Sequence, residues 1–109
     1  MRKSGRDRIV LVTCANPAEA RRVARAVVEK QLAACANILG SPVESIYRWK
    51  GKVERAREVL MLVKTTAKRL PELEREVKRL HSYEVPEFVA LPILAGSRDY
   101  LRWLADAVR

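Results

Sequence analysis

Hydrophobic residues occur along the chain in two patterns, continuous or alternating runs typical of strands and three-to-four-residue steps typical of helices. The apolar run at residues 9–14 predicts a strand covered on both faces and central in its sheet. Residues 34–39 predict a second strand, which is followed by a glycine and a proline. Apolar and polar side chains then alternate over residues 43–65 and predict a long hairpin, and residues 87–91 predict a short last strand.

Two internal segments carry apolar residues on one helical face. The first helix begins at an N-cap, Asn16, which is followed by a proline and by Glu19, whose side chain can reach back toward the cap. The second helix has its apolar face within residues 70–80. Its start lies either near Ala67 or at Pro71, because a proline is accepted in a first helical turn.

These elements follow the order β-α-β-β-α-β, and a third helix, capped by Ser97, ends the chain. The order predicts an α+β protein of the ferredoxin-like split β-α-β class, with an antiparallel sheet and both main helices on one face. At 109 residues the chain has the length of one domain. We assign residues 9–109 to this domain and predict that residues 1–8 form a basic, flexible N-terminal segment. Since many unrelated activities use this fold, the fold alone predicts no function.

Charge is the first compositional feature that bears on function. The chain has 22 Lys and Arg against 13 Asp and Glu, a formal net charge of +9. Part of the excess lies in residues 1–8, and elsewhere the two signs mix at helical spacing, as on solvated faces. An RNA-binding protein of this fold would carry aromatic residues on its central strands, and residues 9–14 and 59–63 contain none. The sequence therefore disfavours a nucleic-acid partner.

Hydropathy and cysteine content predict the cellular location. No apolar run approaches the roughly 18 residues of a membrane span. The basic start of the chain is not followed by the apolar stretch of a secretory leader, and two cysteines are too few for a disulfide framework. We therefore expect a cytoplasmic protein with no membrane partner.

The predicted hairpin is too long for the helices to cover. A helix over residues 17–30 spans about 21 Å, whereas a strand over residues 53–65 spans about 43 Å. The distal half of the hairpin carries Tyr47 and Trp49, and an isolated two-stranded ribbon is marginally stable in water. Either these rings fold back onto their own sheet or onto Trp103, or another copy of the chain covers them. The lengths favour self-association through strand pairing and aromatic contacts.

Few residues offer catalytic or metal-ligating chemistry. Cys14 closes the first strand directly before a helix N-terminus, where the helix dipole favours a thiolate, and we expect it to be reactive. His81 is the only histidine, and Glu84 and Glu87 follow it closely. A Cys, a His and a Glu together suit copper(II) or zinc, and copper generally binds such sites more tightly.

Each of these residues also has a purely structural interpretation. His81 lies near a helix C-terminus, where it can act as a cap alone, and the two glutamates can be ordinary surface residues. Cys35 lies inside an apolar run and is assigned to the core. A nucleophilic pair of Cys14 and His81 would lack an orienting third group, and the sequence has neither a phosphate-binding glycine loop nor a GxSxG motif. We therefore expect a non-enzymatic protein.

Four ordered segments and the C-terminal stretch carry a specific resemblance. They are LAACANI at residues 32–38, SIYRWKGK at 45–52, EV running to KTT within 58–66, HSYEVPE at 81–87 and GSRDYLRWL at 96–104. Together they closely resemble the CutA divalent-cation tolerance proteins, and the likeness runs in order from residue 9 to the C-terminus.

The resemblance implies a small cytoplasmic homotrimer of ferredoxin-like subunits, similar in build to the PII signalling proteins, with strands joined between subunits. It also implies a link to copper tolerance and binding of copper(II) or another divalent cation. The implied ligands are Cys14 and His81, with Glu84 as a third donor, and Leu80 stands where some relatives have a second histidine. On this hypothesis, clefts between subunits bring Cys14 close to His81.

An alternative function within the same fold is a PII-like signalling or interaction scaffold. Such a protein would bind a small anion or nucleotide in the clefts between subunits. Arg48, Lys64 and Lys68 would then supply the positive charge.

Overall fold

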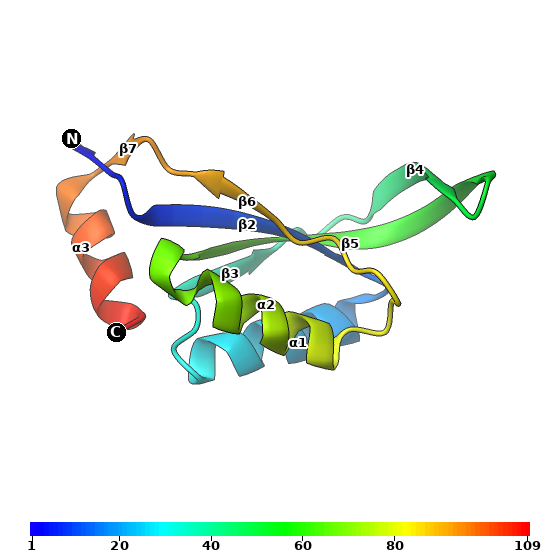
Figure 1. Cartoon of the computed structure of the whole chain (residues 1–109), viewed down its shortest axis with the longest axis horizontal. Helices are drawn as coiled ribbons and strands as arrows, with labels where there is room; N and C mark the ends of the chain where they lie inside the picture. The colour runs from blue at the N-terminus through cyan, green and yellow to red at the C-terminus, as the bar shows by residue number, and fades with distance from the viewer.

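An antiparallel sheet with two helices against one of its faces forms the body of the protein (Figure 1). The computed structural model describes the whole chain, from Met1 to Arg109. The elements in chain order are β1 (Arg2–Lys3), β2 (Asp7–Cys14), α1 (Pro17–Glu29), β3 (Cys35–Ile38), β4 (Val43–Trp49), β5 (Lys52–Thr66), the 3-10 turn η1 (Ala67–Arg69), α2 (Leu70–Leu80), β6 (Val89–Pro92), β7 (Ala95–Gly96) and α3 (Arg98–Ala107).

The main sheet has the strand order β3-β5-β2-β6, and β4 pairs with the far half of β5. The strands β2 and β3, which α1 connects, therefore lie on either side of β5, as the split β-α-β arrangement requires. The helices α1 and α2 cover the same face of the sheet (Figure 1). The predicted α+β class, the antiparallel sheet and the central position of the first long strand are confirmed.

Alternate residues of the two central strands point toward the helices and form the core. β2 and β5 pair along the whole length of β2. Val10, Val12, Met61 and Val63 are completely buried in this interface, because side chains on a strand alternate between its faces. The helices contribute Ala20, Val23 and Val27 from α1, and Leu73 and Val77 from α2.

Both predicted helix caps are present. The Asn16 side chain accepts a hydrogen bond from the backbone N–H of Glu19 at 2.9 Å, and the Ser97 hydroxyl accepts one from the N–H of Tyr100 at 3.2 Å. The start of α2 combines the two predicted alternatives, since η1 runs directly into α2 and Pro71 occupies the first turn of the helix.

Part of the basic N-terminal segment is paired in the structure. Arg2 lies opposite Gly96 in the small sheet of β1 and β7, and the N–H of Ser4 donates to the carbonyl of Leu94 at 2.9 Å. β2 begins at Asp7 rather than at residue 9, because its pairing with β5 extends to the end of that strand. The flexibility of residues 1–8 stays a prediction.

The hairpin of β4 and β5 projects beyond the ends of the helices (Figure 1), and the longest dimension of the molecule is 44 Å. Its turn places Lys50 at φ 50° and Gly51 at φ 80°, the left-handed conformation that tight hairpin turns require. Trp103 packs against another aromatic ring of α3, at the opposite end of the sheet from β4 (Figure 1). Tyr47 and Trp49 therefore do not fold back onto Trp103.

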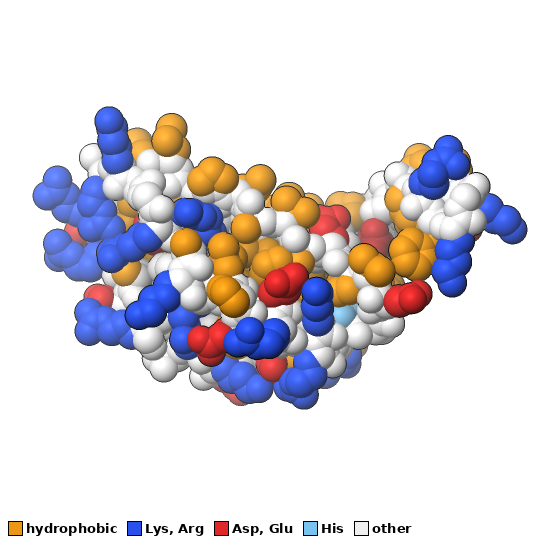
Figure 2. All heavy atoms as spheres, viewed as in Figure 1, with side chains coloured by type: hydrophobic (Ala, Val, Ile, Leu, Met, Phe, Trp, Pro, Cys, Tyr) orange, Lys and Arg blue, Asp and Glu red, His pale blue; other side chains and the backbone are white.

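One face of the sheet has apolar side chains but is not covered by α1 or α2. Leu11 lies opposite Leu62 on β5 and Val89 on β6, and Ile9 lies opposite Leu91. Directly opposed residues point to the same face of a sheet, so these side chains share one surface. Val89 and Leu91 are 47% and 43% exposed. Figure 2 shows hydrophobic side chains along the hollowed upper edge of the molecule, above β2 and β6.

None of the helices combines the length and the hydropathy that a helix needs to span a membrane.

Candidate functional site

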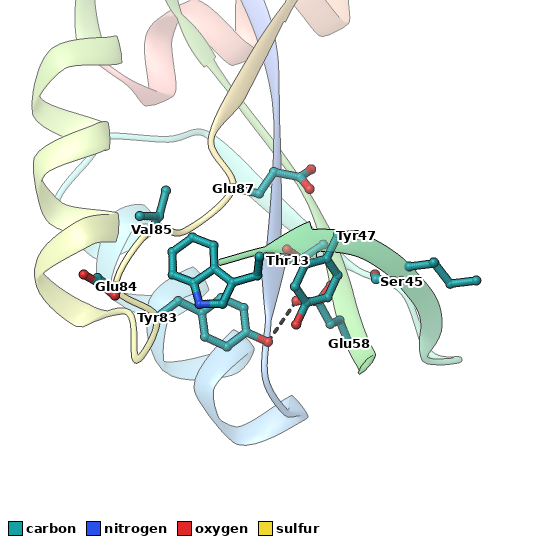
Figure 3. A pocket seen from close by; sticks show the side chains of 10 residues that line it. Thr13, Ser45, Tyr47, Glu58, Tyr83, Glu84, Val85 and Glu87 are labelled. Atoms are coloured by element: carbon teal, nitrogen blue, oxygen red, sulfur yellow. Dashed lines mark hydrogen bonds between the residues drawn. The ribbon is translucent and has the colours of Figure 1, made fainter. Parts of the chain in front are cut away.

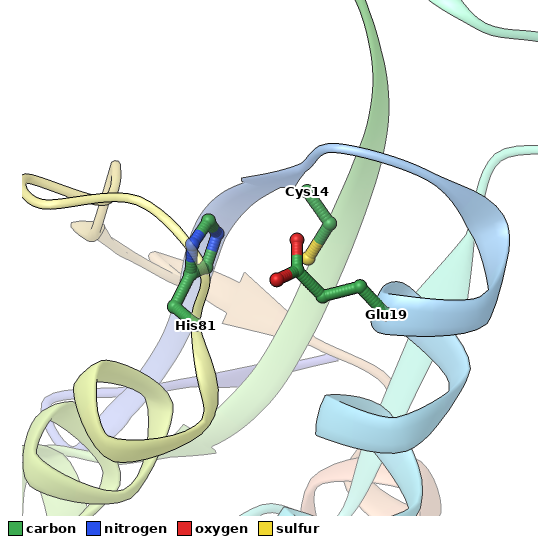
Figure 4. A group of neighbouring side chains, drawn as sticks. All are labelled: Cys14, Glu19 and His81. Atoms are coloured by element: carbon green, nitrogen blue, oxygen red, sulfur yellow. The ribbon is translucent and has the colours of Figure 1, made fainter.

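Cys14, Glu19 and His81 meet where three elements end or begin (Figure 4). Cys14 is the last residue of β2, Glu19 lies in the first turn of α1, and His81 is the C-cap of α2. Their potential ligand atoms all lie within 4.8 Å of one another, and all three residues are buried. The structure therefore brings Cys14 and His81 together within one chain, without a contribution from a neighbouring subunit.

Both ring nitrogens of His81 have hydrogen-bond partners. Nε2 lies 2.7 Å from the carbonyl oxygen of Thr13, and the backbone N–H of Tyr83 donates to Nδ1 at 3.0 Å. A carbonyl oxygen only accepts, and Nδ1 acts as an acceptor. The two contacts are satisfied together when Nε2 donates to the carbonyl and Nδ1 accepts from the N–H.

Both carboxylate oxygens of Glu19 accept backbone hydrogen bonds. The N–H of Ala15 donates to Oε2 at 2.9 Å, and the N–H of Ser82 donates to Oε1 at 2.7 Å. Burial alone would raise the pKa of Glu19, but these hydrogen bonds to the charged form hold its pKa below the ordinary value of 4.5. Glu19 is thus an ionised residue that ties the end of α2 to the start of α1.

The Cys14 thiol is protonated rather than reactive. The side chain is completely buried, and burial, with a further contribution from the charge of Glu19, raises the pKa of the Cys14 thiol to about 12. The predicted activation by the helix N-terminus is therefore wrong, because desolvation and a neighbouring carboxylate outweigh the helix dipole.

The ligand atoms of these three residues lie close enough together to hold a metal ion. Metal ligation would require the Cys14 thiol to lose its proton and Nδ1 of His81 to give up the hydrogen bond from the N–H of Tyr83. Glu19, which lies beside them, is recognisable in the sequence only as a helix-capping residue. Glu84 is exposed and lies outside this group.

A pocket with a volume of about 580 Å³ opens beside the cluster of Cys14, Glu19 and His81 (Figure 3). It lies between the base of the hairpin and the segment that follows α2. It is lined by Thr13, Ser45, Ile46, Tyr47, Trp49, Glu58, Tyr83, Glu84, Val85 and Glu87.

The pocket is acidic although the chain is strongly basic. Its lining contains Glu58, Glu84 and Glu87 and no Lys or Arg, and none of these carboxylates forms a salt bridge. The Tyr83 hydroxyl donates to Glu58 Oε2 at 2.8 Å. Burial is the main cause that raises the pKa of Tyr83 and the pKa of Glu87, and the neighbouring Glu58 raises both further. Three carboxylates therefore lie in this pocket without a basic side chain of the lining beside them.

The other residues singled out in the sequence lie elsewhere. Cys35 is half-buried on the sheet edge, 3.8 Å from the hydroxyl of Tyr100, so its assignment to the core is wrong. Cys35 is only half-buried because β3 is an edge strand, which has a neighbouring strand on one side only. Lys64 donates to the same hydroxyl at 3.2 Å, and neither Lys64, Arg48 nor Lys68 lines the acidic pocket.

Comparison with known proteins gives concordant matches. The family described as CutA1 divalent ion tolerance protein matches residues 8–107. The divalent-cation tolerance protein CutA of Thermus thermophilus is 50% identical over 100 residues, which is 92% of this chain and 96% of that protein.

Solved structures agree with the sequence comparison. The Cut A1 structure from Thermus thermophilus has a TM-score of 0.91 at 48% identity and covers 94% of this chain and 99% of its own. A CutA structure from Archaeoglobus fulgidus, described as periplasmic, has a TM-score of 0.90 at 39% identity with the same coverage of both chains. Fold and matches together define a divalent-ion tolerance protein. The chain belongs to the CutA1 family.

Proposed function

We propose that this protein is a non-enzymatic homotrimer that binds copper(II) or another divalent cation as part of the cellular response to metal ions. We further propose that the cation is attracted to the acidic pocket rather than bound by Cys14 and His81. The observation that carries this proposal is the charge of the pocket lining, which has three glutamates and no basic residue in a chain of net charge +9. Carboxylate oxygens are common ligands of divalent cations.

Calorimetric titration of copper(II) chloride into the purified protein tests this location. We expect the pocket variant Glu58→Gln with Glu87→Gln to bind copper at least about tenfold more weakly, because the attraction of two nearby charges is lost. Cys14→Ala is expected to bind like the unmodified protein. Glu29→Gln with Glu74→Gln, which removes two negative charges from exposed helix positions, is the matched control. Loss of binding in Cys14→Ala with normal binding in the pocket variant would contradict the proposal.

The proposal of a homotrimer is supported by the uncovered face of the sheet. Leu11, Leu62, Val89 and Leu91 form an apolar surface on a central region of the molecule, and the exposed hairpin continues beside it. Contiguous apolar surfaces of this kind typically mark protein interfaces. A second copy presents the same surface, so cyclic association covers it without another partner.

Sedimentation equilibrium measures the oligomeric state. We expect a mass three times 12.4 kDa for the unmodified chain. Leu62→Glu, which places a charge on the uncovered face, is expected to dissociate the assembly, whereas Val28→Glu, at an exposed position of α1, leaves it intact. A monomer that persists at high protein concentration would refute the trimer.

The alternative function, a PII-like signalling or interaction scaffold, would bind a small anion or nucleotide in clefts between subunits, and the lining of the acidic pocket does not favour it. Three carboxylates repel an anion, and the basic residues proposed for that role lie outside the pocket. A cytoplasmic location is likewise a proposal, and fractionation of cells expressing the protein tests it.

A further inference from the structure

We propose that the acidic pocket binds a small organic ammonium ion, held by Glu58 and by the aromatic rings of Tyr47, Trp49 and Tyr83. This inference rests on the proposed cation-binding role of the pocket and names a ligand class for the same site. It is argued from the shape, the charge and the aromatic lining of the pocket.

The first observation is a buried carboxylate without a cationic partner. Glu58 is only 7% exposed, and its single hydrogen bond to a protein side chain comes from the Tyr83 hydroxyl, which engages one of its two oxygens. Buried carboxylates are normally paired with a basic residue or a metal, because desolvating an isolated charge is costly. No Lys or Arg of this chain lines the pocket, so its own lining supplies no compensating positive charge to Glu58.

The second observation is the separation of the carboxylates. Glu58, Glu84 and Glu87 line one pocket, yet their oxygens do not converge as the ligand atoms of Cys14, Glu19 and His81 do. A divalent metal ion that keeps part of its water shell can still interact with carboxylates spaced in this way. A larger cation spreads its charge and can interact with carboxylates that lie farther apart.

The third observation is the aromatic wall. Figure 3 shows Tyr83 and Tyr47 beside Glu58 in the pocket, with the Tyr83 hydroxyl directed at the carboxylate, and Trp49 also lines the pocket. An ammonium group placed over an aromatic ring is attracted by the electron-rich face, most strongly for Trp and for substituted ammonium groups. A volume of about 580 Å³ suits a small molecule.

Together these features match a substituted ammonium ion with a short apolar body. The charge would lie near Glu58, and the alkyl groups would contact Tyr47, Trp49 and Tyr83. Ile46 and Val85 supply additional apolar surface at the rim. A nucleotide or carboxylic acid would meet repulsion at the same position.

Fluorescence offers a direct test, because the chain has only two tryptophans. In a Trp103→Phe background the signal comes from Trp49 alone. Choline chloride is titrated as the probe, with its uncharged carbon isostere 3,3-dimethyl-1-butanol as the matched ligand control. We expect choline to change the Trp49 emission saturably and the neutral isostere to bind at least about fivefold more weakly.

Variants separate charge from aromatic contact. Glu58→Gln in the Trp103→Phe background is expected to weaken choline binding at least about fivefold, whereas Glu29→Gln in that background leaves it unchanged. Trp49→Leu, followed by calorimetry, should weaken choline binding as well. Circular dichroism verifies that each variant is folded.

The outcomes distinguish this inference from the proposal on which it rests. Equal binding of choline and its neutral isostere, or no saturable change with choline, overturns the ammonium proposal, even if copper binding still depends on Glu58 and Glu87. If Glu58→Gln dissociates the oligomer and choline has no effect, a basic side chain of a second copy occupies the pocket, and the proposal is also overturned. Copper binding that depends on Cys14 instead refutes only the proposed location of the metal.

Discussion

Nε2 of His81 lies 2.7 Å from the carbonyl oxygen of Thr13, although the two residues are 68 positions apart in the chain. On its other side, His81 accepts the N–H of Tyr83, whose hydroxyl reaches Glu58 in the acidic pocket. The only histidine of the chain therefore joins the end of β2 to the segment after α2. Its structural effect is to hold Tyr83 in place.

This relationship predicts that His81→Ala is destabilising. The substitution leaves the buried carbonyl of Thr13 without its partner, which costs about 1 to 3 kcal/mol. Urea unfolding at matched protein concentration measures the loss. Ser41→Ala is the control, since the Ser41 side chain is exposed and lies outside the cluster, in the loop before β4. Equal stability of His81→Ala and the unmodified protein would show that the hydrogen bonds contribute nothing.

The two cysteines are expected to differ in reactivity. Cys14 is completely buried with a thiol pKa of about 12, whereas Cys35 is half-buried at the sheet edge. Ellman's reagent at pH 8 should therefore modify one thiol of the native protein and both thiols in denaturant. Cys35→Ser should abolish the native reaction. Rapid labelling of the native Cys35→Ser variant would show that Cys14 is accessible and reactive.

Tyr83 is expected to ionise at higher pH than an ordinary tyrosine. Burial and the neighbouring Glu58 raise its pKa above the ordinary value of 10. Alkaline titration followed by tyrosinate absorbance should show a late step that is missing in Tyr83→Phe. That variant also loses the hydrogen bond to Glu58, at a cost of about 1 kcal/mol. Tyr100→Phe, which alters a tyrosine outside the pocket, should retain the late step.

Glu76 makes stability depend on acidic pH. Arg79 donates to its two oxygens at 2.9 and 2.7 Å and Lys30 donates at 2.7 Å, and these bonds hold the pKa of Glu76 at about 2. A carboxyl with a lowered folded-state pKa stabilises the protein above its unfolded pKa of about 4.5, and this contribution is lost as the pH falls toward 2.

Comparison of Glu76→Gln with the unmodified protein measures this contribution. We expect the variant to be less stable at pH 7 by about 1 kcal/mol, because its partners are half exposed to solvent. The difference should shrink between pH 4.5 and 2. Glu74→Gln, which breaks the exposed pair with Lys78, should show a much smaller pH-dependent difference. A Glu76→Gln difference that stays constant down to pH 2 would contradict the assignment.

Local signals in the sequence determined the elements and their order. Asn16 and Ser97 cap their helices because capping depends on residues within one turn, and Lys50 and Gly51 form the hairpin turn because its conformation depends on the turn residues themselves. The CutA1 family membership was also readable, since the segments that carry the resemblance follow one another along the chain.

Tertiary structure alone decided the environment of each functional side chain. Glu19 meets His81 only because α1 and α2 pack on the same face of the sheet, and the burial of Cys14 beside Glu19 leaves its thiol protonated rather than reactive. The acidic pocket likewise combines residues of β2, β4, β5 and the segment after α2. Sequence patterns report which residues are apolar or charged, whereas desolvation and electrostatic interaction depend on distances in space, which the packing of separate elements sets.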